Sequence, residues 1–342
     1  MAIAVHTREI KHPIMFLRSG RTGYIAGRIV GSDGANRRAA CAARHTNKGE
    51  RAMTDKTGVG VIGAGLMGEG MAANLLTAGY RVGVLAHRNR APVDRLIARG
   101  ASEAMDAPSL AAASDVVVLC LPNADIVDRV MEDVLPHLRD GALVIDTTTS
   151  LPETSERWAV RLADEGKWFV DAPVTGGPEE AAAGRLKSLV GATPEALDIA
   201  RPCLEATSER VFHFGGPGRG NAAKLINNYL TLIDAALAVQ VMLRCDRLGI
   251  DRRQMHEVIS GGAARSGMYT RIMEGAVDGD YDGHKFSLVN AAKDIRYAGL
   301  LARAAGEDGA IADAVEAFYE KAMEKVPPDT FVSRLLDPDR SG

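Results

Sequence analysis

The clearest chemical signal is a set of three glycines, Gly63, Gly65 and Gly68. They follow the apolar run 59–62, which predicts a buried strand, and they open a helical pattern. In this setting the first glycine permits a tight turn, the second lets the backbone approach a pyrophosphate, and the third lets helix and strand pack closely. The helix N-terminus favours the anion. We therefore predict a dinucleotide site formed by Gly63, Ala64, Gly65, Leu66, Met67 and Gly68.

The stretch after the second predicted strand, 81–85, bears on the choice of dinucleotide. An enzyme that uses NAD usually offers a carboxylate here to the ribose hydroxyls. This chain has His87, Arg88, Asn89 and Arg90 instead, and its next carboxylate is Asp94. A guanidinium can bind two oxygens of a ribose 2′-phosphate, which a carboxylate would repel. We expect the histidine and both arginines to bind NADP, with NAD as the less favoured cofactor; alternatively, the arginines only solvate the start of a helix.

Lys224 and Asn228 stand four residues apart, and therefore lie on one face of the helix that follows the glycine-rich turn 216–220. Hydride transfer to a carbonyl builds charge on its oxygen, so the reaction needs a positioned proton donor. An ammonium that donates the proton, directed by an amide, meets this need. A solvated lysine is the alternative, but the surrounding sequence is strongly apolar. Asn227 points about a quarter-turn away, and we expect it to serve packing.

A second group of donors lies at Thr175, Gly176 and Gly177. It offers a hydroxyl and two backbone N–H groups that no side chain obstructs. Such a nest of donors suits an anion. We expect it to hold the carboxylate of a small substrate.

Strands and helices alternate along the part of the chain that must position these residues. Apolar runs predict strands at 59–62, 81–85, 116–121 and 143–146, with weaker ones at 188–190 and 211–214. Helical patterns occur at 66–78, 91–99, 124–138, 152–165 and 194–207, and only helical patterns follow residue 220, beginning with 221–248. This predicts an α/β fold, with a Rossmann doubly wound sheet followed by an all-helical domain. The predicted boundaries are 57–218 for the Rossmann domain, 219–328 for the helical domain and 329–342 for a tail.

The long predicted helix 221–248 is apolar around most of its surface. A helix of that kind has to be buried. We expect the helical domain, with a second subunit wrapped against it, to provide the burial.

Composition and charge favour some classes of protein over others. The 342 residues carry a net charge of −3, but residues 1–52 have ten Lys/Arg against three Asp/Glu, which is +7 and leaves −10 for the rest. An acidic body argues against nucleic acid or an anionic membrane as a partner. The four cysteines form no CxxC pair, so we expect neither a metal site nor a disulfide framework, and a cytoplasmic location. We interpret residues 1–56 as a basic, disordered extension, because Met53 lies just ahead of the first predicted strand and could be the original start; a targeting arm is the alternative.

Four blocks resemble, in order and spacing, the 3-hydroxyisobutyrate dehydrogenase family, also called the β-hydroxyacid dehydrogenases. They are the fingerprint 63–68, DAPVTGGP at 171–178, GPGRGNAAKLINN at 216–228, and Lys293 followed by Asp294. The family's substrate motif reads DAPVSGG, so Thr175 replaces a serine here and adds a methyl group at the substrate contact. The resemblance spans about residues 58–325 and implies the roles given above for Lys224, Asn228 and the motif 175–177.

The resemblance also implies further cofactor contacts. Thr149 is similar to the family's threonine after the fifth strand, and Leu121, Pro122 and Asn123 resemble the loop beside the cofactor ribose. Lys293 resembles the lysine that closes over the nicotinamide, with the next aspartate holding the local geometry. For each of these, an ordinary loop or helix residue is the alternative.

The expected activity is hydride transfer between NADP(H) and a small 3-hydroxy acid or its semialdehyde, in a homo-oligomer, either a dimer or a tetramer. We favour substrates of the tartronate semialdehyde/glycerate or 3-hydroxyisobutyrate type. The alternatives are a glyoxylate or succinate semialdehyde reductase, a reductase of the sulfonate analogues, and a non-catalytic NADP-binding redox sensor. A 6-phosphogluconate dehydrogenase would need a longer helical part, and imine reductases generally lack a lysine at the position of Lys224. The substrate's chain length would be selected by helical-domain side chains, which include Ser266, Met268, Tyr269 and Phe286.

Overall fold

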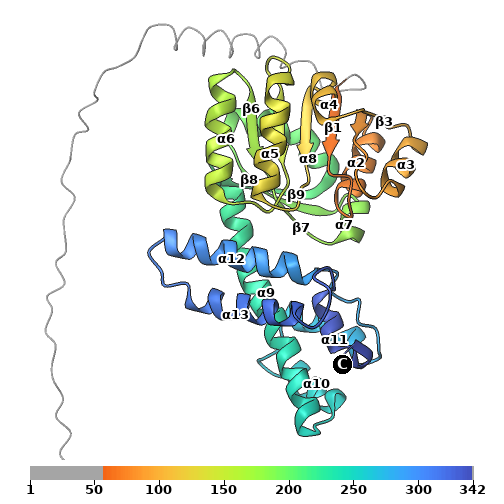
Figure 1. The fold of residues 1–342 in the computed structure, drawn as a ribbon, viewed down its shortest axis with the longest axis vertical. Helices are drawn as coiled ribbons and strands as arrows, with labels where there is room; N and C mark the ends of the chain where they lie inside the picture. Colours follow the sequence, from red (N-terminus) through yellow and green to blue (C-terminus); the bar gives the residue numbers. More distant parts are fainter. Residues whose placement is uncertain (1–56, 341–342) are drawn as a thin grey trace, which may run out of the picture. The chain divides into compact units, whose positions relative to one another are not determined.

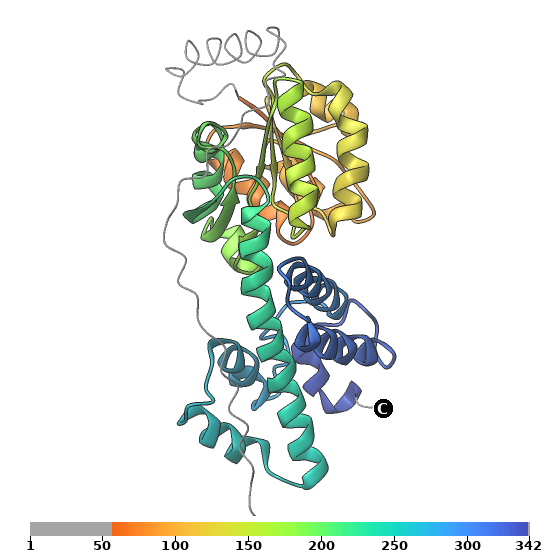
Figure 2. The same ribbon diagram turned by 90° about the vertical axis from the view of Figure 1, so that its left-hand side faces the viewer.

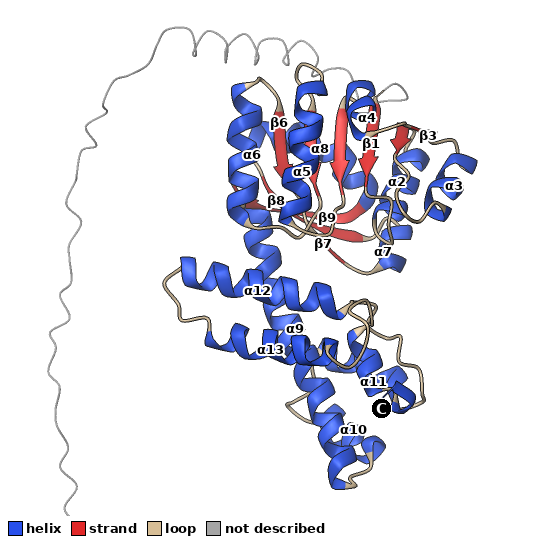
Figure 3. Ribbon diagram, in the orientation of Figure 1, coloured by secondary structure: helices blue, strands red, loops and turns tan. Residues whose placement is uncertain are grey.

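The computed structural model describes residues 57–340, so the predicted extension 1–56 lies outside the described residues (Figure 1). Strands and helices alternate up to residue 215, and helices follow (Figure 3). The elements of the first part are β1 (Gly58–Ile62), α2 (Gly68–Thr77), β2 (Arg81–Val84), α3 (Ala91–Ala98), β3 (Ser102–Glu103), α4 (Ala107–Ala113), β4 (Val116–Leu119), α5 (Ala124–Val134), η1 (Leu135–His137), β5 (Leu143–Asp146), α6 (Pro152–Asp164), β6 (Trp168–Asp171), β7 (Val174–Thr175), α7 (Pro178–Ala182), β8 (Leu186–Gly191), α8 (Pro194–Thr207) and β9 (Ser208–Gly215). Those of the second part are α9 (Arg219–Leu248), α10 (Arg252–Ser260), α11 (Gly267–Ala276), α12 (Leu288–Ala304), α13 (Ala310–Met323), η2 (Val332–Leu336) and η3 (Pro338–Arg340).

The strands of the described chain form one sheet, in the order β3-β2-β1-β4-β5-β6-β8-β7, with β9 paired to β8. Strands β1 to β6 pair in parallel, and β8 runs antiparallel to β6 and β7. The order reverses at β1, because β2 and β3 lie on one side of it and β4 to β6 on the other. This confirms the predicted Rossmann fold. In such sheets ligands bind beyond the carboxyl ends of the strands at the point of reversal, here between β1 and β4.

Helices cover both faces of the sheet (Figure 2). One apolar cluster includes residues of α2, α3 and α8, and the other includes residues of α4, α5 and α6. Strand β4 shows why its sequence is an unbroken apolar run. Val116 and Val118 belong to the first cluster, whereas Val117 and Leu119 belong to the second. A central strand buried on both faces needs apolar residues at every position.

The helices after residue 218 have their own apolar core, which α9 shares with α11, α12, α13 and η2. Figure 2 shows α12 and α13 on one side of α9, and α10 and α11 on the other. Val332 and Leu336 are fully buried in this core, so the described part of the predicted tail 329–342 is packed. Within the described residues, α9 is also the one helix whose length and composition would allow it to cross a membrane.

A single chain does not bury α9 on all sides, and the burial expected of this helix also called for a second subunit. Ile226, Leu230, Leu237 and Leu248 are all more than half exposed. Their spacing of four, seven and eleven residues is close to multiples of the helical repeat, so they lie along one side of the helix. The single chain therefore leaves an apolar stripe on α9 in contact with solvent.

Candidate functional site

The glycine loop between β1 and α2 has the geometry that the fingerprint predicts. Gly63 has a φ of +105°, and a Cβ there would lie 2.1 Å from the carbonyl oxygen of Cys120. A Cβ at Gly68 would lie 2.0 Å from the carbonyl oxygen of Gly63, so helix and loop are in close contact. A Cβ at Gly65 would have no atom within 4 Å. Turn geometry requires glycine at position 63, and close packing requires it at position 68. Gly65 instead leaves its backbone accessible, which fits the approach of a dinucleotide pyrophosphate.

The loops after β4 and β5 meet at Lys293 of α12. Its ammonium donates to the carbonyl oxygen of Pro122 at 2.7 Å and to that of Thr149 at 3.1 Å. It also forms an ion pair with Asp294 at 3.0 Å. The structure therefore brings three of the predicted cofactor contacts together and ties them to the helical part of the chain. Asn123 lies in the same loop, but its side chain caps α5 by accepting from the N–H of Ile126 at 3.0 Å.

The two arginines after β2 differ in their surroundings. Arg90 donates to both carboxylate oxygens of Glu103, at 2.9 and 2.7 Å, and forms an ion pair with Asp94 at 3.0 Å. Among residues 57–340, Arg88 has no ion-pair partner, and both it and His87 are at the surface of the loop. Arg88 is therefore the guanidinium available to a phosphate, whereas Arg90 would first have to leave two carboxylates.

Lys224 and Asn228 lie buried on one face of α9. Asn228 donates its amide N–H to Asp294 Oδ2 at 2.6 Å, and its amide oxygen accepts from Asn227 Nδ2 at 3.1 Å. Asn227 thus orients Asn228, a contact beyond the packing expected of it. Burial lowers the pKa of the Lys224 ammonium to about 8; the Asp294 carboxylate opposes this shift, and Lys293 adds to it. An amine that titrates near neutral pH can both donate and accept a proton.

Asp171, at the end of β6, holds the start of α9. This fully buried carboxylate accepts from the N–H of Gly218 at 2.7 Å and from that of Asn221 at 2.8 Å. The side chain of Asn221 in turn accepts from the N–H of Ser150 at 2.8 Å and donates to Ser155 Oγ at 3.1 Å. These bonds fix the helix that carries Lys224 against the loop that carries Thr149. Neither Asp171 nor Asn221 was predicted to have a role, although both lie inside the motifs.

A second buried carboxyl, Asp146, pairs with Asp171 in the register of β5 and β6. Burial raises the pKa of Asp146 to about 7 and that of Asp171 to about 6. Asp146 Oδ1 accepts from the N–H of Thr148 at 2.9 Å, and Thr148 Oγ1 accepts from the N–H of Leu121 at 3.0 Å. Through these two bonds, Asp146 and Thr148 link the two loops that meet at Lys293.

The substrate motif contains a feature that was not foreseen. Gly176 adopts a φ of +120°, which favours glycine. The N–H of Gly177, the N-cap residue of α7, donates to the side chain of Glu180 at 2.7 Å. One of the three predicted donors is therefore already engaged, which leaves the Thr175 hydroxyl and the Gly176 N–H. A glutamate three residues after an N-cap is one half of the capping-box signal, and this half of the signal could have revealed the contact.

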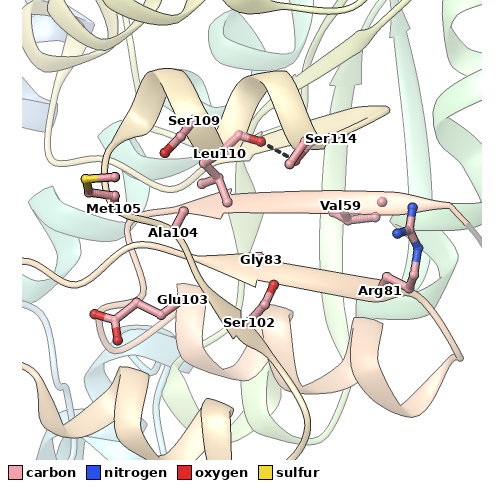
Figure 4. Close-up of a pocket in the computed structure, with 12 residues that line it drawn as sticks. Val59, Arg81, Gly83, Ser102, Glu103, Ala104, Met105, Ser109, Leu110 and Ser114 are labelled. Atoms are coloured by element: carbon pink, nitrogen blue, oxygen red, sulfur yellow. Dashed lines mark hydrogen bonds between the residues drawn. The ribbon is translucent and has the colours of Figure 1, made fainter.

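A groove elsewhere on the sheet has no part in this arrangement. Figure 4 shows it between α4 and the strands β1 to β3, with Gly83, Ser102 and Leu110 among its lining residues. It contains neither the fingerprint glycines nor the residues around Lys224. Its one link to the predicted cofactor site is Glu103, the partner of Arg90.

Two family models together match nearly all of the described chain. One describes the NAD binding domain of 6-phosphogluconate dehydrogenase and matches residues 58–215. The other describes the NAD-binding domain of NADP-dependent 3-hydroxyisobutyrate dehydrogenase and matches residues 218–337.

Relatives and solved structures agree with these matches. The chain is 32% identical to a 2-(hydroxymethyl)glutarate dehydrogenase of Eubacterium barkeri, over 73% of this chain and 83% of the relative. It is also 32% identical to an NAD-dependent L-serine dehydrogenase of Pseudomonas aeruginosa, over 82% of this chain and 98% of the relative. The structure of a Mycobacterium tuberculosis 3-hydroxyisobutyrate dehydrogenase with L-serine superposes with a TM-score of 0.71 and 26% identity, covering 84% of this chain and 100% of that one.

A Rossmann sheet, an open glycine loop and a buried lysine with its amide partner define a nicotinamide-dependent dehydrogenase. More specifically, the chain belongs to the 3-hydroxyisobutyrate dehydrogenase family, as its motifs predict, and is an NAD(P)-dependent 3-hydroxyacid dehydrogenase.

Proposed function

We propose that the protein uses NADP(H) to interconvert a small 3-hydroxy acid and its semialdehyde, with Lys224 as the proton-transferring residue. The observation that carries the proposal is the position of this lysine. It is buried, its pKa is lowered to about 8, and it shares a face of α9 with Asn228. A buried ammonium with so low a pKa has little structural use, but it suits general acid–base catalysis.

The reaction divides between the cofactor and the side chains of the protein. Bound NADPH supplies the hydride to the carbonyl carbon of the semialdehyde. The Lys224 ammonium donates a proton to the carbonyl oxygen as negative charge develops there. Asn228, held by Asp294 at 2.6 Å, orients that oxygen. In the direction of oxidation, the neutral amine of Lys224 accepts the hydroxyl proton.

Thr175 and the two glycines after it are proposed to hold the substrate carboxylate. The Thr175 hydroxyl and the Gly176 N–H are the donors free to bind this carboxylate, because the Gly177 N–H is already bonded to Glu180. Glycine at both positions keeps side chains away from the carboxylate. Ser266 and Tyr269, two of the residues expected to select chain length, are occupied inside the helical part: Ser266 caps α11 and Tyr269 contacts His256. Met268 and Phe286 are only partly buried against the same helical core, and we propose that they contribute to selection by chain length.

The choice of NADP rests on Arg88 and on the absence of a carboxylate between β2 and Asp94. We expect Arg88→Ala to raise KM for NADPH about tenfold, because a charged hydrogen bond to phosphate is lost, and to leave KM for NADH unchanged. Arg90→Ala should have a smaller effect, because Glu103 and Asp94 engage that guanidinium. Initial rates with both cofactors measure this. A wild-type preference for NADH would refute the choice of NADP.

We propose a short hydroxy acid or its semialdehyde as the substrate. Tartronate semialdehyde with glycerate and methylmalonate semialdehyde with 3-hydroxyisobutyrate are our first candidates, followed by glyoxylate, succinate semialdehyde and sulfonate analogues. A panel of these compounds, assayed in both directions with NADPH and NADH, tests the function. Protein that binds NADPH but turns over none of them would favour the alternative, a redox sensor without catalytic activity.

We further propose that the protein works as a cytoplasmic homo-oligomer. The support for an oligomer is the exposed stripe of α9, in which Leu230 is 71% exposed. An apolar stripe of this kind is commonly covered by a subunit interface. Light scattering at two protein concentrations measures the molar mass, and a monomer at both would contradict the proposal.

A further inference from the structure

The side chain of Glu180 lies over the substrate motif. Its Oε2 accepts from the N–H of Gly177 at 2.7 Å. A Cβ placed on Gly176 would lie 3.1 Å from Glu180 Cβ, and one placed on Gly177 would lie 3.1 Å from Glu180 Oε2. The glutamate therefore packs against both glycines, and its carboxylate takes up the Gly177 N–H that the proposed substrate carboxylate would use.

Simultaneous binding of the Glu180 carboxylate and a substrate carboxylate at the Gly177 N–H is energetically unfavourable. They would compete for one N–H donor, and their charges would repel each other at short range. The Gly177 N–H and Glu180's own N–H lower the pKa of the glutamate, so it stays ionised at neutral pH. A substrate carboxylate that uses all three donors, the Gly177 N–H included, therefore requires the glutamate to move.

A second partner for the glutamate is already close by. Arg271 of α11 places Nη2 3.8 Å from Glu180 Oε1, beyond hydrogen-bond distance but near enough for an ion pair. The Arg271 and Glu180 side chains are 50% and 33% exposed, so both have room to change rotamer. Arg185 also lowers the pKa of Glu180 through its charge. The carboxylate thus has a cationic position to move to once it leaves the N–H.

We propose that Glu180 is a specificity-determining residue that competes with the substrate carboxylate for the Gly177 N–H and moves to Arg271 when the substrate binds. The proposal rests on the proposed function, because it needs a substrate that carries a carboxylate. It makes Glu180 a positioning residue that sets KM and takes no part in proton or hydride transfer. The competing interpretation is that Glu180 only caps α7.

Steady-state kinetics of Glu180 variants test the proposal, with the best semialdehyde of the panel and an uncharged aldehyde of similar length as substrates. Glu180→Ala frees the N–H, so KM for the semialdehyde should fall about tenfold, the order expected for one charged hydrogen bond, while kcat stays within a factor of about two. Glu180→Gln keeps an acceptor without the charge and should give an intermediate KM. The KM for the uncharged aldehyde should not change.

Glu179→Ala is the matched control. Glu179 carries the same charge on the same short helix, but it is 83% exposed and pairs with Lys285 at 3.4 Å. Its KM should equal the wild-type value. Arg271→Gln should raise KM about threefold where Glu180 is present, the range of a surface ion pair, and should have no effect in the Glu180→Ala background.

The possible outcomes separate this inference from the proposed function. If wild type turns over the semialdehyde and Glu180→Ala leaves its KM unchanged or raises it, Glu180 is only a cap and the inference fails while the function stands. A fall in KM for the uncharged aldehyde as well would also overturn it, because the effect would not depend on the substrate carboxylate. If neither wild type nor any variant turns over a carboxylate-bearing aldehyde, the function and the inference fail together.

Discussion

Replacement of Lys224 by alanine is expected to lower kcat for semialdehyde reduction by about 10²–10⁴-fold, the usual range for loss of a general acid. The Lys224 ammonium is buried on the same face of α9 as Asn228, and its neighbour Lys293 is engaged by the carbonyl oxygens of Pro122 and Thr149, so Lys293 is not positioned to replace it. NADPH binding should persist, because the glycine loop lies on different elements. Single-turnover rates at saturating NADPH, together with a titration of NADPH binding, measure the two effects separately.

Two further variants sharpen this result. Lys224→Arg keeps the positive charge, but a guanidinium does not give up its proton near neutral pH, so activity should stay low. Lys187→Ala removes a lysine whose side chain is 51% exposed, on β8, and should keep the wild-type rate. Wild-type turnover by Lys224→Ala would disprove the assignment of the proton donor.

Of the substitutions proposed for this protein, Asp171→Ala is expected to lower the free energy of unfolding most. The change leaves two buried N–H donors, those of Gly218 and Asn221, without their acceptor. At about 1–3 kcal/mol for each of the two unsatisfied buried groups, the free energy of unfolding should fall by about 2–6 kcal/mol. The start of α9 should loosen as well, so kcat should fall even in the folded fraction. Urea unfolding followed by circular dichroism measures the stability.

Asp106→Ala provides the comparison for Asp171. Asp106 also caps a helix, accepting from the N–H of Ser109 at 2.8 Å, but that contact is exposed to water. The expected loss is about 1 kcal/mol, typical of an exposed N-cap. Equal losses in the two variants would show that burial of the Asp171 contacts adds nothing to stability.

Most of the Rossmann part was predictable because its signals are local. Apolar runs gave β1, β2, β4 and β5, whereas β6 (Trp168–Asp171) was not predicted. The helix 194–207 has the predicted limits. Strand β3 and helix α4 were missed, since Ser102 and Glu103 are both exposed and so lack a core pattern, and α4 is a short helix rich in alanine. The helix predicted at 124–138 ends at Val134, because Pro136 lacks the N–H that would continue it.

The candidate site was predictable as a set of motifs, but its contacts were not. Motif residues such as Gly63 and Lys224 follow from type and spacing. The bonds from Asp171 to the start of α9 and from Lys293 to Pro122 join positions 47 and 171 residues apart, and no local pattern encodes such contacts. The pairing of Arg90 with Glu103 likewise depends on the short strand that was missed. Periodicity also could not show which side of α9 lies outside the core of one chain.

The pH dependence of the reaction in both directions tests the role of Lys224 most directly. With a pKa of about 8, the lysine should be protonated below that pH and neutral above it. We therefore expect kcat/KM for semialdehyde reduction to fall as the pH rises through about 8, and kcat/KM for oxidation of the hydroxy acid to rise through the same pH. Both inflections should vanish in Lys224→Ala. A wild-type profile that is flat across this range, or the same inflection in the variant, would contradict the assignment of Lys224 as the group that moves the proton.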